Sequence, residues 1–313
     1  MRPLVGLEAL EAFEGGAAVA IGTFDGVHLG HRALIARTIE AARELGLTSA
    51  VITWDRHPLA TLRPDAVPPL LTTAERKAEL IEECGVDLLV VLPFDEEFSH
   101  WPPEKFVERV LVEGLGVRSV FVGTGWKFGH KAAGDVALLK EMGAVHGFDV
   151  PEVALTEAAS GPVSSTRVRQ AVAGGEVEVA RMLLSRPFDV DGEVLRGDRR
   201  GTDLGFPTAN TALDDALAHP ARGVYAGRAR TETGVWYAAA IDLGVNPQFG
   251  GDPATSEWRI ESYLLDFSGD LYGQNLRVEF HARLRDEATF SSIDALVAQI
   301  HEDVEATRAL GLG

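Results

Sequence analysis

The chain of 313 residues is long enough for two domains of about 150 residues, each able to close its own core. Its formal charge is −18, from 29 basic and 47 acidic side chains. Residues 1–184 hold 17 basic and 26 acidic side chains and residues 185–313 hold 12 and 21, so each part carries −9. We therefore expect no binding to nucleic acid or to an anionic membrane, because phosphate affinity is built from clustered Lys and Arg.

Cysteine and lysine usage narrows the class of protein further. The single cysteine, Cys84, excludes an internal disulfide and gives no zinc-ligand spacing. The N-terminal residues have no apolar signal-peptide core, and no apolar run approaches the ~20 residues of a membrane span. We expect a cytoplasmic protein. The last lysine is Lys140, so any phosphate site in the second part has to do without lysine.

Short apolar runs alternate with helical patterns in the first part of the chain. The runs are typical of strands buried on both faces of a parallel sheet, and they cover residues 17–21, 49–54, 86–92 and 117–122. Apolar stripes and cap residues predict helices over residues 31–45, 73–84, 103–114 and 136–143. This alternation predicts a doubly wound α/β domain, of the Rossmann-like kind.

The pattern changes in the second part. Two short helices are expected at residues 164–174 and 177–184. Alternating segments separated by turn residues then predict antiparallel strands over residues 188–194, 223–231, 235–243, 259–266 and 276–284. Such a series is typical of a barrel or a sandwich, and an amphipathic helix over residues 292–309 closes the chain. We place the domains at 1–184 and 185–313.

The first candidate site is the segment 22–31, Gly-Thr-Phe-Asp-Gly-Val-His-Leu-Gly-His, between the first buried strand and the first helix. Ligands of open α/β sheets bind at the carboxyl ends of the strands. The glycines allow close backbone approach, and a helix N-terminus favours an anion. His28 and His31 can donate hydrogen bonds to phosphate oxygens. The alternative interpretation is a turn whose histidines only cap and solvate the helix.

This segment resembles the His-x-Gly-His signature of nucleotidyltransferases and, in its full form, that of the bacterial bifunctional riboflavin kinase/FMN adenylyltransferase (FAD synthetase) family. A second signature, Ser-Ser-Thr-x-x-Arg, is present at residues 164–169. The resemblance implies adenylyl transfer from ATP to FMN, with pyrophosphate leaving. It implies that His28 and His31 are catalytic, and that ATP is bound by Gly22, Phe24, Asp25, His28, His31, His57, Ser165, Thr166 and Arg169.

One position departs from the family pattern. Where the family has Asn or Asp followed by Phe, this chain has Gly125 and Trp126. The missing side chain is expected to help bind nucleotide or flavin, and one buried polar contact contributes about 1–3 kcal/mol. The resemblance therefore leaves open a weak or altered adenylyltransferase.

The second candidate site is the glycine-rich segment 197–210, which ends in Phe-Pro-Thr-Ala-Asn. There is no Gly-x-x-x-x-Gly-Lys-Ser/Thr sequence, so a P-loop is excluded. From composition alone, a loop with an Asx turn is the plainer interpretation. The segment resembles the riboflavin kinase domain, a six-stranded antiparallel barrel with a C-terminal helix. That resemblance implies ATP or flavin binding by Gly201, Gly205, Thr208, Asn210 and Arg285, with Mg²⁺ bridging ATP phosphates, Thr208 and Asn210, and with Glu261 as the catalytic base.

Taken together, the motifs predict an enzyme that converts riboflavin and ATP to FMN, and FMN and ATP to FAD. Flavins are its substrates and products, Mg²⁺ acts with ATP, and the protein is expected to be a monomer or a weak homo-oligomer. Two alternatives remain open. One is a riboflavin kinase with a weak or altered-specificity adenylyltransferase domain, and the other is a non-catalytic flavin-binding regulator.

Overall fold

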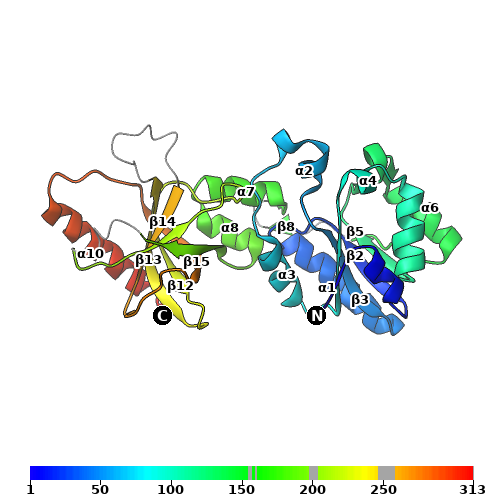
Figure 1. The fold of residues 1–313 in the computed structure, drawn as a ribbon, viewed down its shortest axis with the longest axis horizontal. Coiled ribbons are helices and arrows are strands. Elements are labelled where there is room, and N and C mark those ends of the chain that lie inside the picture. The colour runs from blue at the N-terminus through cyan, green and yellow to red at the C-terminus, as the bar shows by residue number, and fades with distance from the viewer. Residues whose placement is uncertain (154–156, 159–160, 197–203, 246–257, 313) are drawn as a thin grey trace. The chain divides into compact units, whose positions relative to one another are not determined.

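The computed structural model describes residues 1–153, 157–158, 161–196, 204–245 and 258–312 (Figure 1). It divides into two compact units, Met1–Ser165 and Thr166–Gly313. The division falls after Ser165, the first residue of two short helices over residues 165–184, whose other residues group with the second unit. The boundary expected at residue 184 stays a prediction.

The first unit is built on a parallel sheet of five strands in the order β1-β4-β3-β2-β5. These strands are β1 (Arg2–Val5), β2 (Ala17–Ile21), β3 (Thr48–Trp54), β4 (Leu88–Leu92) and β5 (Ser119–Val122). All their pairings are parallel, and β2 is buried along its whole length. The doubly wound α/β prediction is confirmed. Strand β1 was not expected, because it is a short, mostly exposed edge strand without a buried apolar run.

Helices cover both faces of this sheet, with one hydrophobic core on each side. The helices are α1 (Leu29–Leu45), α2 (Pro58–Leu62), α3 (Ala74–Glu82), α4 (Glu96–Ser99), α5 (Pro103–Phe106), the π-helix η3 (Val107–Gly114), α6 (Val136–His146), and the 3-10 turns η1 (Glu8–Ala12), η2 (Pro64–Ala66) and η4 (His130–Ala132). Two small hairpins pair β6 (Lys127–Phe128) with β7 (Gly134–Asp135), and β8 (Glu157–Ala158) with β9 (Gly161–Pro162). The helix expected over residues 103–114 is present but changes from α to π geometry at Val107.

The second unit contains a closed barrel of six strands in the order β10-β11-β14-β13-β12-β15. Its elements are α7 (Ser165–Ala173), α8 (Val177–Leu184), β10 (Phe188–Leu195), β11 (Ala209–Ala212), β12 (Gly223–Arg230), β13 (Trp236–Val245), β14 (Trp258–Leu264), β15 (Asn275–Arg285) and α10 (Ile293–Ala309). All barrel pairings are antiparallel, which confirms the barrel and closing helix. Strand β11 was not expected from its own pattern, because it has no fully buried apolar run.

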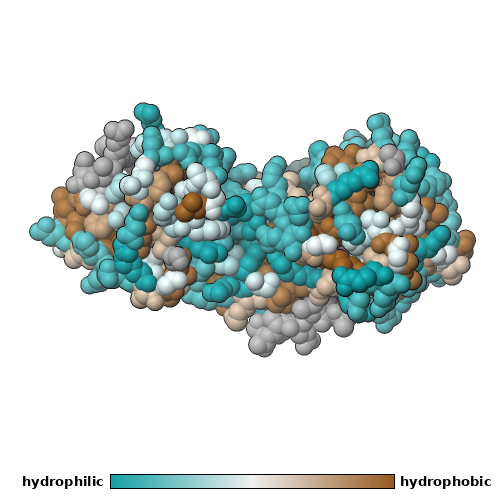
Figure 2. All heavy atoms as spheres, turned by 90° about the horizontal axis from the view of Figure 1, so that it is seen from below, coloured by the Kyte–Doolittle hydropathy of each residue, from teal (hydrophilic) through white to brown (hydrophobic). Residues whose placement is uncertain are grey.

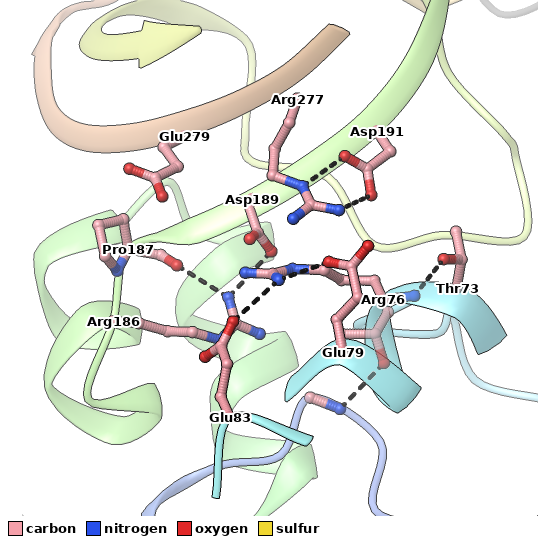
Figure 3. Close-up of polar contacts among 12 residues, drawn as sticks. Thr73, Arg76, Glu79, Glu83, Arg186, Pro187, Asp189, Asp191, Arg277 and Glu279 are labelled. Carbon is pink, nitrogen blue, oxygen red and sulfur yellow. Dashed lines mark hydrogen bonds and ion pairs between the residues drawn. The ribbon is translucent and has the colours of Figure 1, made fainter. Parts of the chain in front are cut away.

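Alternation along the barrel strands sorts side chains between the interior and the outer face. Phe188, Tyr225 and Phe280 fill the interior and are almost fully buried. On the outer face, Asp191 of β10 lies opposite Arg277 of β15, and the two form a two-pronged ion pair (Figure 3). On another part of the outer face, α10 packs against β12 and β13.

On the face shown in Figure 2, hydrophilic residues predominate and hydrophobic ones form smaller groups. Among the residues that the structure describes, no helix is both long and apolar enough to cross a membrane.

Candidate active sites

A cavity of about 790 Å³ opens at the carboxyl edge of the parallel sheet in the first unit. Its lining includes the ends of β2, β3 and β5, at Ile21, Trp54 and Gly123. Because β2 lies between β3 and β5, the strand order reverses beside it, which is where such sheets bind ligands. None of the lining residues in the described part of the chain is Asp or Glu, although the whole protein carries −18. The cavity is therefore suited to an anion.

His28 and His31 both line this cavity at the start of α1. His28 is the N-cap residue, and its Nδ1 accepts a hydrogen bond from the His31 backbone N–H at 3.3 Å. A neutral His28 therefore carries its proton on Nε2, where it can be donated to a ligand. The rings stack with their centroids 3.6 Å apart. The two histidines thus cap the helix and also face the cavity.

His31 is held neutral in the absence of a ligand. Burial lowers its pKa well below the ordinary value, and the nearby charges of His28 and Lys77 lower it further. Its Nδ1 is buried without a hydrogen-bond partner. A polyphosphate at this position would reverse the effect, since an anion stabilises the imidazolium. His31 can therefore take up a proton when an anionic ligand binds.

The loop before α1 has a strained backbone and is held in place by hydrogen bonds. Phe24 and Val27 have positive φ angles of 51° and 40°, unusual for residues with a Cβ and especially for a β-branched one. Asp25 is 6% exposed, and its carboxylate accepts hydrogen bonds from the Leu71 N–H at 2.9 Å and the Thr72 hydroxyl at 3.5 Å. Asp25 therefore anchors the loop, whereas Gly22 and Phe24 line the cavity.

The second signature is brought to the first by tertiary structure. The Ser165 hydroxyl donates to the Asp25 backbone carbonyl at 3.0 Å, and Ser164 lines the cavity. Thr166 and Arg169 follow on the first turn of α7. Their predicted contacts with the ATP phosphates stay a prediction.

His57 lies at the start of α2 and is not among the cavity-lining residues. Its Nδ1 accepts from the Leu59 backbone N–H at 3.2 Å, so it caps this short helix. Its neighbour Pro58 does line the cavity. Nucleotide binding by His57 stays a prediction.

Another part of the cavity wall is aromatic. The side chains concerned are Trp54, Phe94, Phe98, Trp101, Phe106, Trp126 and Phe128. Trp126 stacks on Phe128 with a centroid distance of 4.6 Å and an interplanar angle of 13°. Such a wall suits a planar aromatic ligand. Sequence motifs did not reveal it, because its members come from four separate segments.

Gly125 lies in a tight turn beside this wall. The Trp126 N–H donates to the Gly123 carbonyl at 3.1 Å, and Gly125 has a φ of 75°, the geometry of a type II turn. A Cβ at this position would meet no heavy atom within 4 Å. The departure from Asn or Asp is therefore not imposed by crowding.

A polar row crosses the outer face of the barrel in the second unit. Asn210 on β11 lies directly opposite Glu261 on β14, and Glu261 lies opposite Asp242 on β13. The Thr208 hydroxyl donates to Glu261 Oε2 at 3.2 Å. The predicted residues Thr208, Asn210 and Glu261 are thus brought together. Gly205, with a φ of 88°, lies just before them, and Gly201 falls outside the described residues.

Two further residues extend this row. Desolvation raises the pKa of Asp242 to about 6, and the carboxylates of Glu287 and Glu261 contribute to the rise. Arg285 lies on β15 in the same ring of the barrel and makes a two-pronged ion pair with Asp303 of α10. Asp242 was missed from the sequence, where its only signal is one acidic residue in an apolar strand. The ATP or flavin role of Arg285 stays a prediction.

The two sites define a class of protein: a nucleotidyltransferase-like α/β domain joined to a barrel that carries a carboxylate beside a hydroxyl and an amide. The FAD synthetase family matches residues 10–167, and the riboflavin kinase family matches residues 184–310. The chain belongs to the bifunctional riboflavin kinase/FMN adenylyltransferase family.

Individual relatives support this membership. The bifunctional riboflavin kinase/FMN adenylyltransferase of Pseudomonas fluorescens is 39% identical over 310 residues, which cover 99% of this chain and 98% of that protein. The protein of the same description from Listeria monocytogenes is 38% identical over 294 residues, covering 93% and 91%. A crystal structure described as a macrolide-efflux protein from Streptococcus pneumoniae has a TM-score of 0.86 at 30% identity and covers 98% of both chains.

Proposed function

We propose that this chain phosphorylates riboflavin to FMN with ATP and then adenylylates FMN to FAD. The observation that carries the proposal is the junction of two motifs 140 residues apart, where Ser165 binds the Asp25 carbonyl beside His28 and His31. The names of the relatives agree with both reactions. We do not extend the efflux description of the pneumococcal protein to this chain, because both matched families describe flavin enzymes.

In the first unit, an FMN phosphate oxygen attacks the α-phosphorus of ATP, the bond to the β-phosphate oxygen breaks, and pyrophosphate leaves. Such a transfer requires positioning and charge stabilisation rather than a protein nucleophile. His28 donates from Nε2 to the polyphosphate, and His31 becomes protonated beside it. The aromatic wall around Trp126 holds the flavin ring.

In the second unit, the riboflavin 5′-hydroxyl attacks the γ-phosphorus of ATP, and ADP leaves. Glu261 accepts the hydroxyl proton. The hydrogen bond from Thr208 fixes one oxygen of Glu261 and leaves the other for the substrate. Glycine backbone N–H groups and Arg285 serve the ATP phosphates in place of lysine.

The residues of the second site fit Mg²⁺. Thr208 and Asn210 offer neutral oxygen ligands of the kind that this hard cation accepts, and Thr208 keeps lone pairs while it donates to Glu261. No group of three or more His, Cys, Asp or Glu suited to a metal occurs among the described residues. We therefore propose that Thr208 and Asn210 hold Mg²⁺ together with the ATP phosphates, where the ion neutralises phosphate charge.

One alternative is favoured by a specific observation. Gly125 lacks the side chain that relatives are expected to use, so a weak or altered adenylyltransferase beside a working kinase is the second candidate. The Thr208–Glu261 hydrogen bond disfavours a non-catalytic regulator, because it prepares a base for a hydroxyl substrate. We further propose a cytoplasmic protein that is a monomer or a weak homo-oligomer, which sedimentation at several concentrations would test.

The deciding experiment incubates the purified full chain with riboflavin, ATP and Mg²⁺ and separates FMN from FAD. FAD formation supports the bifunctional proposal. FMN that accumulates without FAD supports the kinase with a weak adenylyltransferase. Absence of both products refutes the enzymatic proposal altogether.

A further inference from the structure

Helix α3 carries a lysine that belongs to neither signature and does not line the cavity. Lys77 Nζ donates to the Thr53 hydroxyl at 3.3 Å and to the Trp54 carbonyl at 3.1 Å. Both acceptors are at the carboxyl end of β3, and Trp54 lines the cavity. Lys77 therefore ties α3 to the edge of the sheet where the site is formed.

Thr53 connects Lys77 to the loop of residues 22–31 through two hydrogen bonds. Its hydroxyl accepts from Lys77 and donates to the Thr23 carbonyl at 3.1 Å. Thr53 is fully buried, so water does not compete for these bonds. Thr23 lines the cavity and directly precedes Phe24, which has a positive φ. A continuous chain of hydrogen bonds thus runs from Lys77 to the strained part of the loop.

The charge of Lys77 interacts electrostatically with ionisable groups of the same site. Burial lowers the pKa of Lys77, and the carboxylates of Asp25 and Asp55 act in the opposite direction by attracting the ammonium. Lys77 in turn lowers the pKa of His31, together with burial and His28. Its electrostatic partners therefore include an anchor of the loop and a histidine of the cavity.

Arg76, the neighbouring cation on α3, forms ion pairs within its own helix. The Arg76 guanidinium pairs with the carboxylates of Glu79 at 2.9 Å and Glu83 at 3.3 Å on the same helix (Figure 3). These carboxylates neutralise its charge locally. Both hydrogen-bond acceptors of Lys77 are uncharged, whereas those of Arg76 on its own helix are carboxylates.

We propose that Lys77 is a positioning residue for adenylyl transfer: it holds Thr53 and thereby the loop at Thr23, and its charge helps to offset that of the polyphosphate bound at His28 and His31. This inference rests on the proposed adenylyltransferase function. It assigns to α3 a part in the site that the two signatures do not include.

The test compares K77M, which keeps the length of the side chain without its charge, with K77R, which keeps the charge. Both are made in the full chain and assayed with Mg²⁺ and ATP. We expect K77M to raise the KM for ATP in FMN-to-FAD conversion about tenfold, the typical loss for one charged hydrogen bond. The KM of K77R for ATP should stay close to the wild-type value. The rate of riboflavin phosphorylation should not change in either variant. K140M is the matched control, since Lys140 is exposed and pairs with the exposed Glu152 at 2.9 Å.

A second measurement separates electrostatics from general damage to the structure. The pKa of His31, followed by NMR titration of the protein without ligand, should rise in K77M and stay low in K140M. Thr53→Val breaks the link to Thr23 but keeps the ammonium, so it should raise the KM for ATP while the His31 pKa stays low. T53V also tests the proposal if K77M does not fold.

The outcomes distinguish the inference from the proposed function. A folded K77M with unchanged KM for ATP and unchanged His31 pKa overturns the role of Lys77. An unchanged KM in folded T53V overturns the loop-holding part. A wild-type protein that makes no FAD refutes the adenylyltransferase itself.

Discussion

Restoring a side chain at position 125 tests whether the chain's departure from its family limits FAD synthesis. Gly125 occupies the third position of a type II turn, with φ 75°, and a Cβ there would meet no heavy atom within 4 Å. Asn is the residue that best replaces Gly in this conformation. G125N therefore places an amide between the cavity-lining residues Thr124 and Trp126 without a clash.

Two separate magnitudes follow from this geometry. Because Gly125 is exposed, a new hydrogen bond from this position to a ligand contributes about 0.5–1.5 kcal/mol, or roughly two- to tenfold in affinity. The left-handed backbone costs a residue with a Cβ about 1 kcal/mol, but in the free and the bound protein alike. The gain should therefore appear in the KM for FMN or ATP, whereas the cost should appear as a melting temperature lower by about 2–4 °C.

The assay measures FAD formation from FMN and ATP at several substrate concentrations, with thermal unfolding of each variant. G125A is the matched control, because alanine bears the backbone cost without an amide and should lose stability with no gain in FAD formation. If folded G125N forms FAD no faster than wild type, Gly125 is not what limits the reaction. An equal gain in G125A would refute the hydrogen-bond argument.

Three further predictions concern ionisable groups. E261Q should abolish FMN formation and leave FMN-to-FAD conversion intact, and joint loss of both activities in a folded variant would show that the two sites are not independent. His31 is neutral at pH 7 because its pKa is lowered, so ATP binding should take up a proton and tighten from pH 8 to pH 6; calorimetry in buffers of different ionisation enthalpy should detect this in wild type and not in H31Q. Asp242 has a raised pKa of about 6, so the folded state binds its proton more tightly than the unfolded state, and this contribution to stability is lost as the pH rises through 6. D242N should remove that loss, and melting curves from pH 4 to pH 8 with no difference between wild type and D242N would contradict this expectation. Pairing with Arg308 lowers the pKa of Asp266, so its contribution is lost only as the pH falls below the ordinary Asp range, and D266N should leave the pH dependence between pH 4 and pH 8 unchanged.

Periodicity predicted the long and strongly patterned elements well. The apolar run 17–21 matches β2, because a strand buried on both faces consists of consecutive apolar residues. The apolar residues at helical spacing after His31 match α1, because a helix buried on one face repeats apolar residues every three or four positions. Strands β1 and β11 were missed because neither has the fully buried apolar run that marked β5, which is equally short. Their strand geometry is decided by partners far along the chain, β4 for the first and β14 for the second.

The sites divide in the same way. The residue order indicated His28 and His31 by itself, because a helix start and glycines are local features. Ser165, Thr208 and Glu261 were expected only through the resemblance to the family. Only the folded chain joined Ser165 to Asp25 and Thr208 to Glu261, assembled the aromatic wall, and put Lys77 in contact with Thr53. It also made Asp25 an anchor of the loop, with its carboxylate turned toward Leu71. The physical reason is that hydrogen bonds, burial and pKa values depend on distances between segments that lie far apart in sequence. The −9 charge of each half led us to expect no polynucleotide binding, and the fold then formed a cavity that has no Asp or Glu among its described lining residues.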